Sequence, residues 1–312
     1  MRRAAGGMRA AAVLLAMAGG AAAAEEPTMN ERIRTIVEGP LVVGVEAEAG
    51  EVRRGVRYTE EGADGPALDL YLPRASAPSG RSAWIFVHGG PLPPGMDGAL
   101  RQPREWRFFR DYGELAAAVG RVGVVLGHRY ASLAAIERSA ADLRAGIAWV
   151  RGHAEELGVD PDRLALWLFS GAGVHLPRLL AEPPGGVRSV VAFYPAVDAA
   201  TLAAMGLGLA PAAAAPEAHA TFDPSRAPRL FVARAGLDHP ALLAGLDRFL
   251  SSGLTSGLTL EIASHAQGHH GFELLDDDER SREIVESALR FLVRGESESE
   301  PLPRVARPAP QP

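Results

Sequence analysis

Short apolar runs alternate with helix-like segments along most of the chain from residue 83 onward. The runs occupy residues 83–87, 122–127, 164–169, 190–194, 230–234 and 259–262. Runs that are apolar on both faces are typical of the central strands of a parallel sheet that helices cover on either side. The pattern therefore predicts an α/β domain.

The chain before residue 83 has a different pattern. Residues 68–72 alternate leucine with other side chains, which is the period of two expected for a half-buried strand, and Pro73 ends the pattern. Two further strands are predicted within residues 41–58, on either side of Gly50, and a short helix at residues 28–38. This part of the sheet is expected to be antiparallel.

Two longer helices are predicted from apolar stripes and end signals. Residues 134–157 carry one apolar stripe that Gly158 stops. The last helix follows the acidic run 276–279, which suits a helix N-terminus better than a binding site, and it ends at Gly295. Residues 296–312 lack apolar periodicity, and a disordered tail is predicted there.

The first 24 residues have the pattern of a secretory signal. Three arginines precede an uncharged run at residues 10–24, and the small residues Ala22 and Ala24 stand before Glu25 as a cleavage site would. The run is too short and too rich in alanine for a spanning helix. We expect export to a periplasmic or extracellular location, with no stable membrane span after cleavage; the alternatives are an over-called start codon and an uncleaved anchor.

Charge and cysteine content exclude several functions. Removing residues 1–24 takes away three arginines and no acids, so the formal charge changes from −6 to −9. An acidic chain argues against nucleic acid and anionic lipid as partners. The absence of cysteine excludes thiol nucleophiles, disulfides and thiolate metal sites. We expect one domain over residues 28–295.

Residues 199–216 interrupt the alternation of strands and helices. They are uncharged and rich in alanine and glycine, and Pro211 divides them. They form either a small lid over a cleft or a surface loop of low complexity, because long loops in compact domains tend to be functional or disordered.

A serine ends the third apolar run in the manner of a nucleophile elbow. Such an elbow places a serine on a tight turn between strand and helix, where small neighbours keep the two elements from colliding. Ser170 has Gly171 and Gly173 after it. The strict motif has glycines two residues before and after the serine, where this chain has Leu168 and Ala172. By itself, a serine between glycines after an apolar run is more often an ordinary turn between strand and helix.

Other segments supply the partners that a nucleophilic serine needs. Glycines after the strand 83–87 leave backbone amides accessible, so Gly89 or Gly90, together with Gly171, is the predicted oxyanion hole. His88 is then a residue that shapes this loop from beneath, and not the base. The alternative to an oxyanion hole at Gly89 and Gly90 is a plain glycine turn where the chain leaves the strand.

The base is expected on a loop after the last strand. His270 is the choice there, because His269 would face away. The orienting acid should end a strand between Ser170 and this histidine. Asp238 is the choice and Asp198 is the rival. The order of Ser170, Asp238 and His270 is the order of serine, acid and histidine in α/β-hydrolases.

A metal site is not expected. The spacing of His265 and His269 by four residues suits two metal ligands, but no carboxylate or cysteine completes a set. We expect neither a metal nor an organic cofactor.

Residues 55–294 resemble α/β-hydrolases of the dienelactone-hydrolase and carboxylesterase–lipase neighbourhood. The segments that carry the resemblance are LDLYLP (68–73), HGG (88–90), GHRYAS (127–132), LGVDPDRLALWLFSGAG (157–173), RLFVARAGLD (229–238) and GHHGFE (268–273).

The resemblance implies a mostly parallel sheet of about eight strands, with helices on both faces and a small insertion between strands 6 and 7. It also implies that Ser170 is the nucleophile, His270 the base and then the acid, and Asp238 its orienter, with Gly89, Gly90 and Gly171 around the oxyanion. Arg129 and Asp142 fall on positions where the family has a structural ion pair or hydrogen bond. Dienelactone hydrolases proper use a cysteine, so that activity is not expected.

The expected function is that of an exported serine hydrolase acting on a small-molecule carboxylic ester. A peptidase or amidase of the same fold would use the same residues. A catalytically inactive scaffold that binds a ligand is the other alternative, and Leu168 is the feature that favours it. The sequence does not specify an oligomeric state.

Overall fold

The structure is a computed structural model that describes residues 29–44, 48–74, 80–92, 102–205 and 223–295. The predicted signal at residues 1–24 and the predicted tail at residues 296–312 lie outside the described residues. Most of the segment that was interpreted as a lid or a loop also lies outside them, because residues 206–222 are not described.

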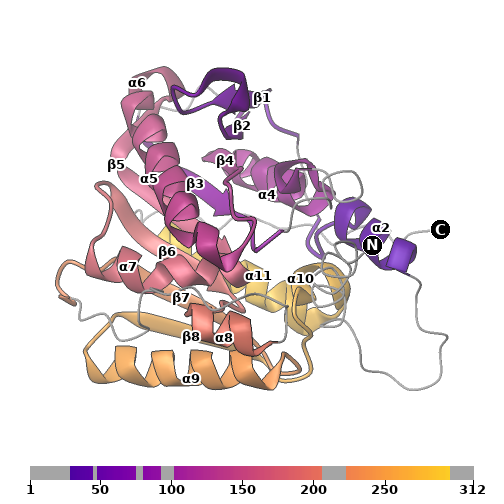
Figure 1. The fold of residues 1–312 in the computed structure, drawn as a ribbon. Coiled ribbons are helices and arrows are strands. Elements are labelled where there is room, and N and C mark those ends of the chain that lie inside the picture. The colour runs from indigo at the N-terminus through magenta and orange to yellow at the C-terminus, as the bar shows by residue number, and fades with distance from the viewer. Residues whose placement is uncertain (1–28, 45–47, 75–79, 93–101, 206–222, 296–312) are drawn as a thin grey trace, which may run out of the picture.

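Within the described residues, eight strands form one sheet in the order β1-β2-β4-β3-β5-β6-β7-β8 (Figure 1). The pairs β1–β2 and β2–β4 are antiparallel, and the other neighbours are parallel. Both parts of the sequence prediction are thereby confirmed. The strands are β1 (Glu51–Arg57), β2 (Ala67–Leu72), β3 (Arg81–Val87), β4 (Val122–Leu126), β5 (Val159–Phe169), β6 (Val187–Phe193), β7 (Arg229–Ala235) and β8 (Leu260–His265).

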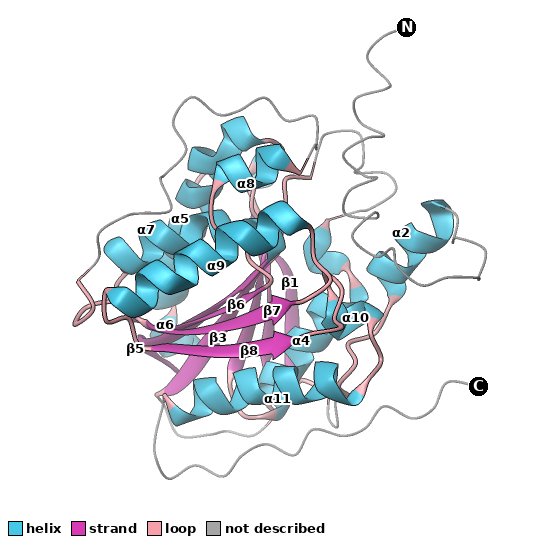
Figure 2. Ribbon diagram, turned by 90° about the horizontal axis from the view of Figure 1, so that it is seen from below, coloured by secondary structure: helices cyan, strands magenta, loops and turns pink. Residues whose placement is uncertain are grey.

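Helices cover both faces of the sheet. Figure 2 shows α5, α7, α8 and α9 on one side and α4, α10 and α11 on the other. The described helices are α2 (Met29–Glu38), α4 (Arg107–Ala118), α5 (Ile136–Gly152), α6 (Ala154–Leu157), α7 (Leu176–Ala181), α8 (Ala199–Ala204), α9 (Pro240–Thr255), α10 (Phe272–Leu275) and α11 (Glu279–Arg294). Helix α8 begins the insertion between β6 and β7.

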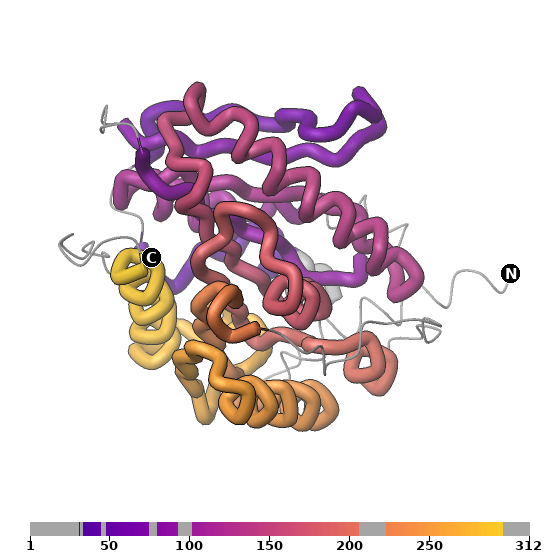
Figure 3. The backbone as a smooth tube through the Cα atoms, turned by 90° about the vertical axis from the view of Figure 1, so that its left-hand side faces the viewer, coloured from indigo at the N-terminus to yellow at the C-terminus, as the bar shows by residue number. Residues whose placement is uncertain are grey.

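The two faces of the sheet bury different kinds of side chain. Along β5, Trp167 and Phe169 point toward α4 and α11 and join a core that is rich in aromatic side chains. Leu166 and Leu168 point the other way, into an aliphatic core with α5, α7 and α9. Successive residues of a strand alternate between faces, so a run that is apolar throughout can feed both cores. Figure 3 shows β1 and β2 at one end of the molecule and α9 at the other.

The described residues 41–44 and 48–49 contain no strand element where the sequence predicted one before Gly50, although Gly44 forms an isolated β-bridge. The amide of Leu41 bonds the Asp111 carboxylate at 3.0 Å, and the amide of Val42 bonds the carbonyl of Glu273 at 2.9 Å. Residues 45–47 are not described. Leu41 and Val42 therefore bond to residues of α4 and α10, and β1 is the only strand among the described residues of 41–58.

The predicted helix at residues 134–157 is divided in two. His153 ends α5, and its ring stacks on Trp149 at 3.9 Å while its Nδ1 lies 2.8 Å from the Trp149 carbonyl oxygen. The His153 amide still donates to the Trp149 carbonyl at 3.0 Å, so the break lies in the backbone of His153, whose φ of −105° and ψ of 15° depart from helical values. Gly158 ends α6 with a φ of 65°, as its position predicted.

Candidate active site

Ser170 follows directly on β5 and has the backbone of a nucleophile elbow. Its φ is 52°, in the left-handed region that non-glycine residues rarely adopt. The following residues form a 3₁₀ turn, Ser170–His175, that leads into α7. Leu168 does not prevent this geometry, because its side chain lies in the aliphatic core and not inside the turn. Sharp left-handed turns of this kind are strained and cluster at functional sites.

The structure brings the three predicted side chains together. The Ser170 hydroxyl lies 2.7 Å from Nε2 of His270, and Nδ1 of His270 lies 2.7 Å from the Asp238 carboxylate. Asp238 accepts from Nδ1–H, which leaves Nε2 free to accept from the serine hydroxyl. His270 and Asp238 are buried, so water competes little for these bonds.

Two backbone hydrogen bonds join the turn that carries Asp238 to the segment that carries His270. Asp238 lies in the turn after β7, and His270 lies in the loop between β8 and α10. The amide of Gly236 bonds the carbonyl of His265 at 2.8 Å, and the amide of Leu237 bonds the carbonyl of Gly268 at 2.9 Å. The rival acid, Asp198, instead caps α8 by accepting from the amide of Thr201.

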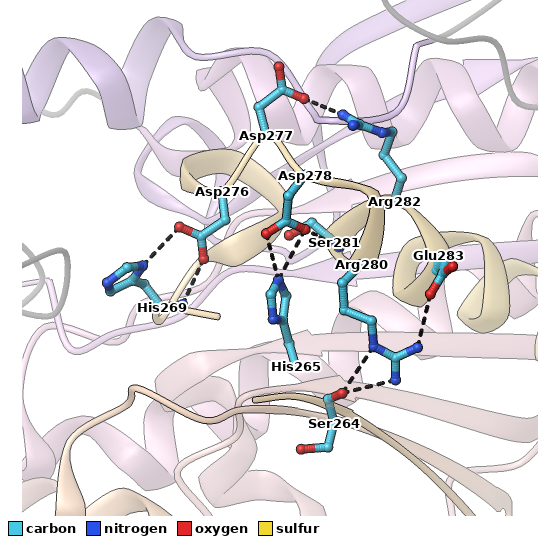
Figure 4. A network of polar contacts seen from close by, with 10 residues as sticks. All are labelled: Ser264, His265, His269, Asp276, Asp277, Asp278, Arg280, Ser281, Arg282 and Glu283. Atoms are coloured by element: carbon cyan, nitrogen blue, oxygen red, sulfur yellow. Dashed lines mark hydrogen bonds and ion pairs between the residues drawn. The ribbon is translucent and has the colours of Figure 1, made fainter. Parts of the chain in front are cut away.

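Two further histidines of this loop bind acids and not each other (Figure 4). His265 lies 3.1 Å from Asp278, and His269 lies 2.8 Å from Asp276. Asp278 also caps α11 by accepting from the amide of Ser281. The acidic run therefore supports a helix N-terminus, as predicted, and also braces the histidine loop. His269 bonds Asp276, and the histidine that lies against the Ser170 hydroxyl is His270.

The glycine loop after β3 touches the elbow. A Cβ added to Gly89 would lie 2.8 Å from Cβ of Ser170, and one added to Gly171 would overlap the carbonyl oxygen of Gly90. Only glycine allows the two segments to approach this closely. The three predicted oxyanion glycines thus lie around Ser170, and their role as donors stays a prediction.

Buried histidines connect this loop to the elbow. The Nδ1 of His88 bonds the Gly89 carbonyl at 2.6 Å, and Nε2 of His128 bonds the His88 carbonyl at 2.9 Å. Ser139 lies between His128 and His175, at 2.7 and 2.8 Å. Burial lowers the pKa of all three histidines, that of His175 to about 3, so the rings are neutral. His88 therefore shapes the loop, as predicted.

The predicted pairing of Arg129 and Asp142 is confirmed. The guanidinium bonds the carboxylate at 2.9 and 2.5 Å, and the amide of Arg129 bonds it at 2.8 Å. Arg129 also contacts Glu61. The pair joins the end of β4 to α5 and does not reach Ser170 by any bond described.

Sequence reasoning missed two residues of the site. Tyr194, directly after β6, lies with its ring 4.3 Å from the imidazole of His270, and its hydroxyl donates to the carboxyl of Glu273. Glu273 is fully buried, and burial raises its pKa to about 7. One available signal was a polar residue at the carboxyl end of a parallel strand, where α/β sheets bind ligands.

A small cavity opens beside Ser170 and His270. Its volume is about 70 Å³, and apolar side chains, aromatic and aliphatic, line most of it. Its lining includes Trp106, Phe108, Phe109, Phe169, Tyr194 and Glu273. An apolar cavity that contains a few polar groups is typical of sites for small molecules.

Two classes of feature are missing from the part of the chain that the structure describes. No cluster of three or more histidine, cysteine, aspartate or glutamate side chains is arranged there to hold a metal ion. No helix there is long and apolar enough to cross a membrane.

Comparisons with known proteins agree with this architecture. Residues 68–185 match the family model BD-FAE. No curated protein sequence matches the chain.

Solved structures with the same fold include esterases. Esterase Est2 of the planctomycete Thermogutta terrifontis is 22% identical over 78% of this chain and 91% of its own, with a TM-score of 0.62. Its butyrate-bound form is 21% identical over 80% of this chain and 96% of its own, with a TM-score of 0.63. A truncated carbohydrate esterase from gut microbiota is 15% identical over 81% of this chain and 99% of its own, with a TM-score of 0.62. The protein therefore has the α/β-hydrolase fold that its sequence resemblance implied, and its residues 68–185 match BD-FAE.

Proposed function

We propose that this protein hydrolyses carboxylic esters, with Ser170 as nucleophile, His270 as base and then acid, and Asp238 as the orienting acid. The observation that carries the proposal is the unbroken hydrogen-bond chain through these three side chains, which starts at a strained elbow. A serine hydroxyl is a weak nucleophile unless a base takes its proton during attack. The fold supports the same reaction, because the similar solved structures include esterases.

The reaction follows from the direction of the hydrogen bonds. Oγ of Ser170 bonds to the ester carbonyl carbon while its proton passes to Nε2 of His270, and the carbonyl electrons move onto oxygen. The intermediate then collapses, the bond to the alcohol breaks, and His270 returns the proton to the departing alkoxide. Water attacks the acyl-serine in the same way, which releases the acid and restores Ser170. Asp238 holds the ring and stabilises the imidazolium.

Backbone amides next to the serine are suited to the developing negative charge. Gly171 follows Ser170 directly, and Gly89 lies against its side chain. Donors fixed before the reaction are worth roughly 10²–10³ in kcat each. We therefore assign the oxyanion to the amides of Gly171 and of Gly89 or Gly90.

The cavity favours a small, apolar acyl group. The rings of Trp106, Phe108, Phe109 and Phe169 surround a space of about 70 Å³ next to Ser170. The Thermogutta terrifontis esterase has been captured with butyrate. Our proposed substrates are esters with acyl chains of roughly two to four carbons. The small volume of the cavity limits the length of the chain, and apolar surface in the cavity favours binding because it leaves water.

The test is labelling with a fluorophosphonate probe, followed by hydrolysis of p-nitrophenyl esters of increasing acyl length. Ser170→Ala is the variant, and Ser251→Ala is the matched control, because Ser251 is exposed on α9. We expect the wild type and the control to label and turn over, and the variant to do neither. A folded wild type that neither labels nor hydrolyses any ester would overturn the proposal and favour a binding scaffold. Faster turnover of matched anilides than of esters would favour the amidase alternative.

Export is also proposed, and its support is the charge pattern of residues 1–24. Expression of the whole chain in a secreting host, with sequencing of the mature N-terminus, tests it. We expect a terminus near Glu25. A cytosolic product that retains Met1 would overturn it.

A further inference from the structure

A second buried acid lies beside His270, outside the chain of Ser170, His270 and Asp238. Glu273 stands three residues after His270, in the first turn of α10, and its side chain is fully buried. It lines the same cavity as Ser170 and His270. Its backbone carbonyl accepts from the amide of Val42 at 2.9 Å, which fixes its position. Buried acids are rare unless they are paired, so this one needs an explanation.

Tyr194 connects Glu273 to the imidazole. The tyrosine hydroxyl donates to Oε1 of Glu273, and the tyrosine ring lies with its centroid 4.3 Å from that of His270. Tyr194 has a φ of 37°, and its amide bonds the Ala233 carbonyl at 2.7 Å. A residue held in this uncommon conformation by its surroundings is a rigid link.

The other oxygen of Glu273 has no comparable bond. Oε2 is buried and has no hydrogen-bond partner among the described residues. The titratable groups that face Glu273 are Tyr194 after β6, Tyr112 on α4, His270 in its loop and Asp276 at the end of α10. Of these, His270 is the group that becomes a cation during the proposed reaction. The attraction between a carboxylate and an imidazolium is strong where water is excluded.

We propose that Glu273 is a positioning residue for His270: it holds the Tyr194 ring against the imidazole, and its carboxylate stabilises the imidazolium that forms when His270 takes the serine proton. The inference rests on the proposed ester hydrolysis. Glu273 exchanges no proton with the substrate, so the reaction balances as before. Its effect is on the stability of the imidazolium formed during the reaction.

The charge of Glu273 changes near neutral pH. Burial raises the pKa of this carboxyl to about 7, while the Tyr194 hydroxyl and His270 oppose the rise. Below that pH the group is protonated and carries no charge toward His270. Above it the carboxylate carries a negative charge, which favours the imidazolium that forms when His270 takes the serine proton. The wild type should therefore gain kcat as Glu273 loses its proton.

The experiment compares the pH profile of ester hydrolysis in the wild type and in Glu273→Gln. Glutamine keeps the shape and can still accept from Tyr194, but it cannot ionise. We expect kcat of the variant to be lower by roughly 3- to 10-fold at pH 8.5, because the imidazolium formed during proton transfer then lacks the stabilising charge of the carboxylate. The ratio should approach one at pH 5.5, and KM should be unchanged.

Two further variants keep the test decisive. Tyr194→Phe keeps the ring but removes the bond to Glu273, so the rise in kcat should move to higher pH, even if Glu273→Gln folds poorly. Tyr58→Phe is the matched control, since it removes a buried tyrosine bond to the Gly127 carbonyl, at 2.6 Å, away from the site. Its profile should follow the wild type.

The outcomes separate this inference from the proposed function. Equal profiles in the wild type and Glu273→Gln, or a loss that is the same at every pH, would overturn the role of the Glu273 charge while the labelled serine still supports ester hydrolysis. A wild type that neither labels nor hydrolyses esters would refute the proposed function, and the role of Glu273 with it.

Discussion

Replacing Leu168 with glycine would restore the residue that the strict elbow motif places two positions before the serine. The structure predicts that this change does harm. The Leu168 side chain is fully buried in the aliphatic core, and its neighbours across the sheet are Val87 and Ala192. Truncating a buried leucine to alanine costs roughly 2–5 kcal/mol of unfolding free energy, and glycine in a strand adds about 0.5–1 kcal/mol. We therefore expect a loss of about 3–6 kcal/mol.

The assay is urea denaturation, combined with kcat per labelled active site. Leu166→Gly is the matched control, because Leu166 is equally buried on the same face of β5 but is farther from Ser170. Both variants should lose similar stability at an unchanged m-value, and kcat per labelled site should not rise in either. A Leu168→Gly protein with wild-type stability and higher kcat would refute the reasoning, since the motif glycine would then be what the elbow needs.

Three other changes have expected outcomes that the same equipment can measure. Glu273 has a folded-state pKa raised from 4.5 to about 7, so its contribution to stability is complete below pH 4.5 and is lost as the pH rises through 7. Between pH 5 and 8 the wild type should lose about 2–3 kcal/mol that Glu273→Gln does not lose; parallel pH dependences in urea would contradict this. Gly171→Ala would push a methyl group into the Gly90 carbonyl oxygen, and kcat should fall by roughly 100-fold with little change in fold by circular dichroism. An active Gly171→Ala would show that the loops are free to separate. Asp278→Ala removes the cap that accepts from the Ser281 amide at 2.7 Å, and thermal unfolding should reveal a loss of about 1 kcal/mol; an unchanged Tm would argue against the cap.

The positions of Ser170, Asp238 and His270 could be predicted because each stands at a strand end or in a loop that the apolar pattern already locates. In a parallel sheet the carboxyl ends of the strands meet at one edge, so residues far apart in sequence converge there. The bonds at 2.7 Å between these side chains agree with that expectation.

The link between Tyr194 and Glu273 could not be predicted in the same way. The two residues are 79 positions apart, and their bond depends on the side-chain direction that follows from the φ of 37° at Tyr194. No periodicity reports such an angle. The break at His153 also depends on backbone angles, a φ of −105° and a ψ of 15°, which a continuous apolar stripe does not indicate.

The two backbone bonds between residues 236–237 and residues 265–268 make the acid and the base one mechanical unit. Since Gly236 and Leu237 immediately precede Asp238, a shift of the end of β7 would carry the His270 loop with it. The distance between the Asp238 carboxylate and the His270 imidazole should then change little when either segment moves. The distance from the imidazole to Ser170 is different, because the histidine loop and the elbow are not joined by these two bonds. Alignment of this site thus reduces to a single adjustable gap, between the histidine loop and the elbow.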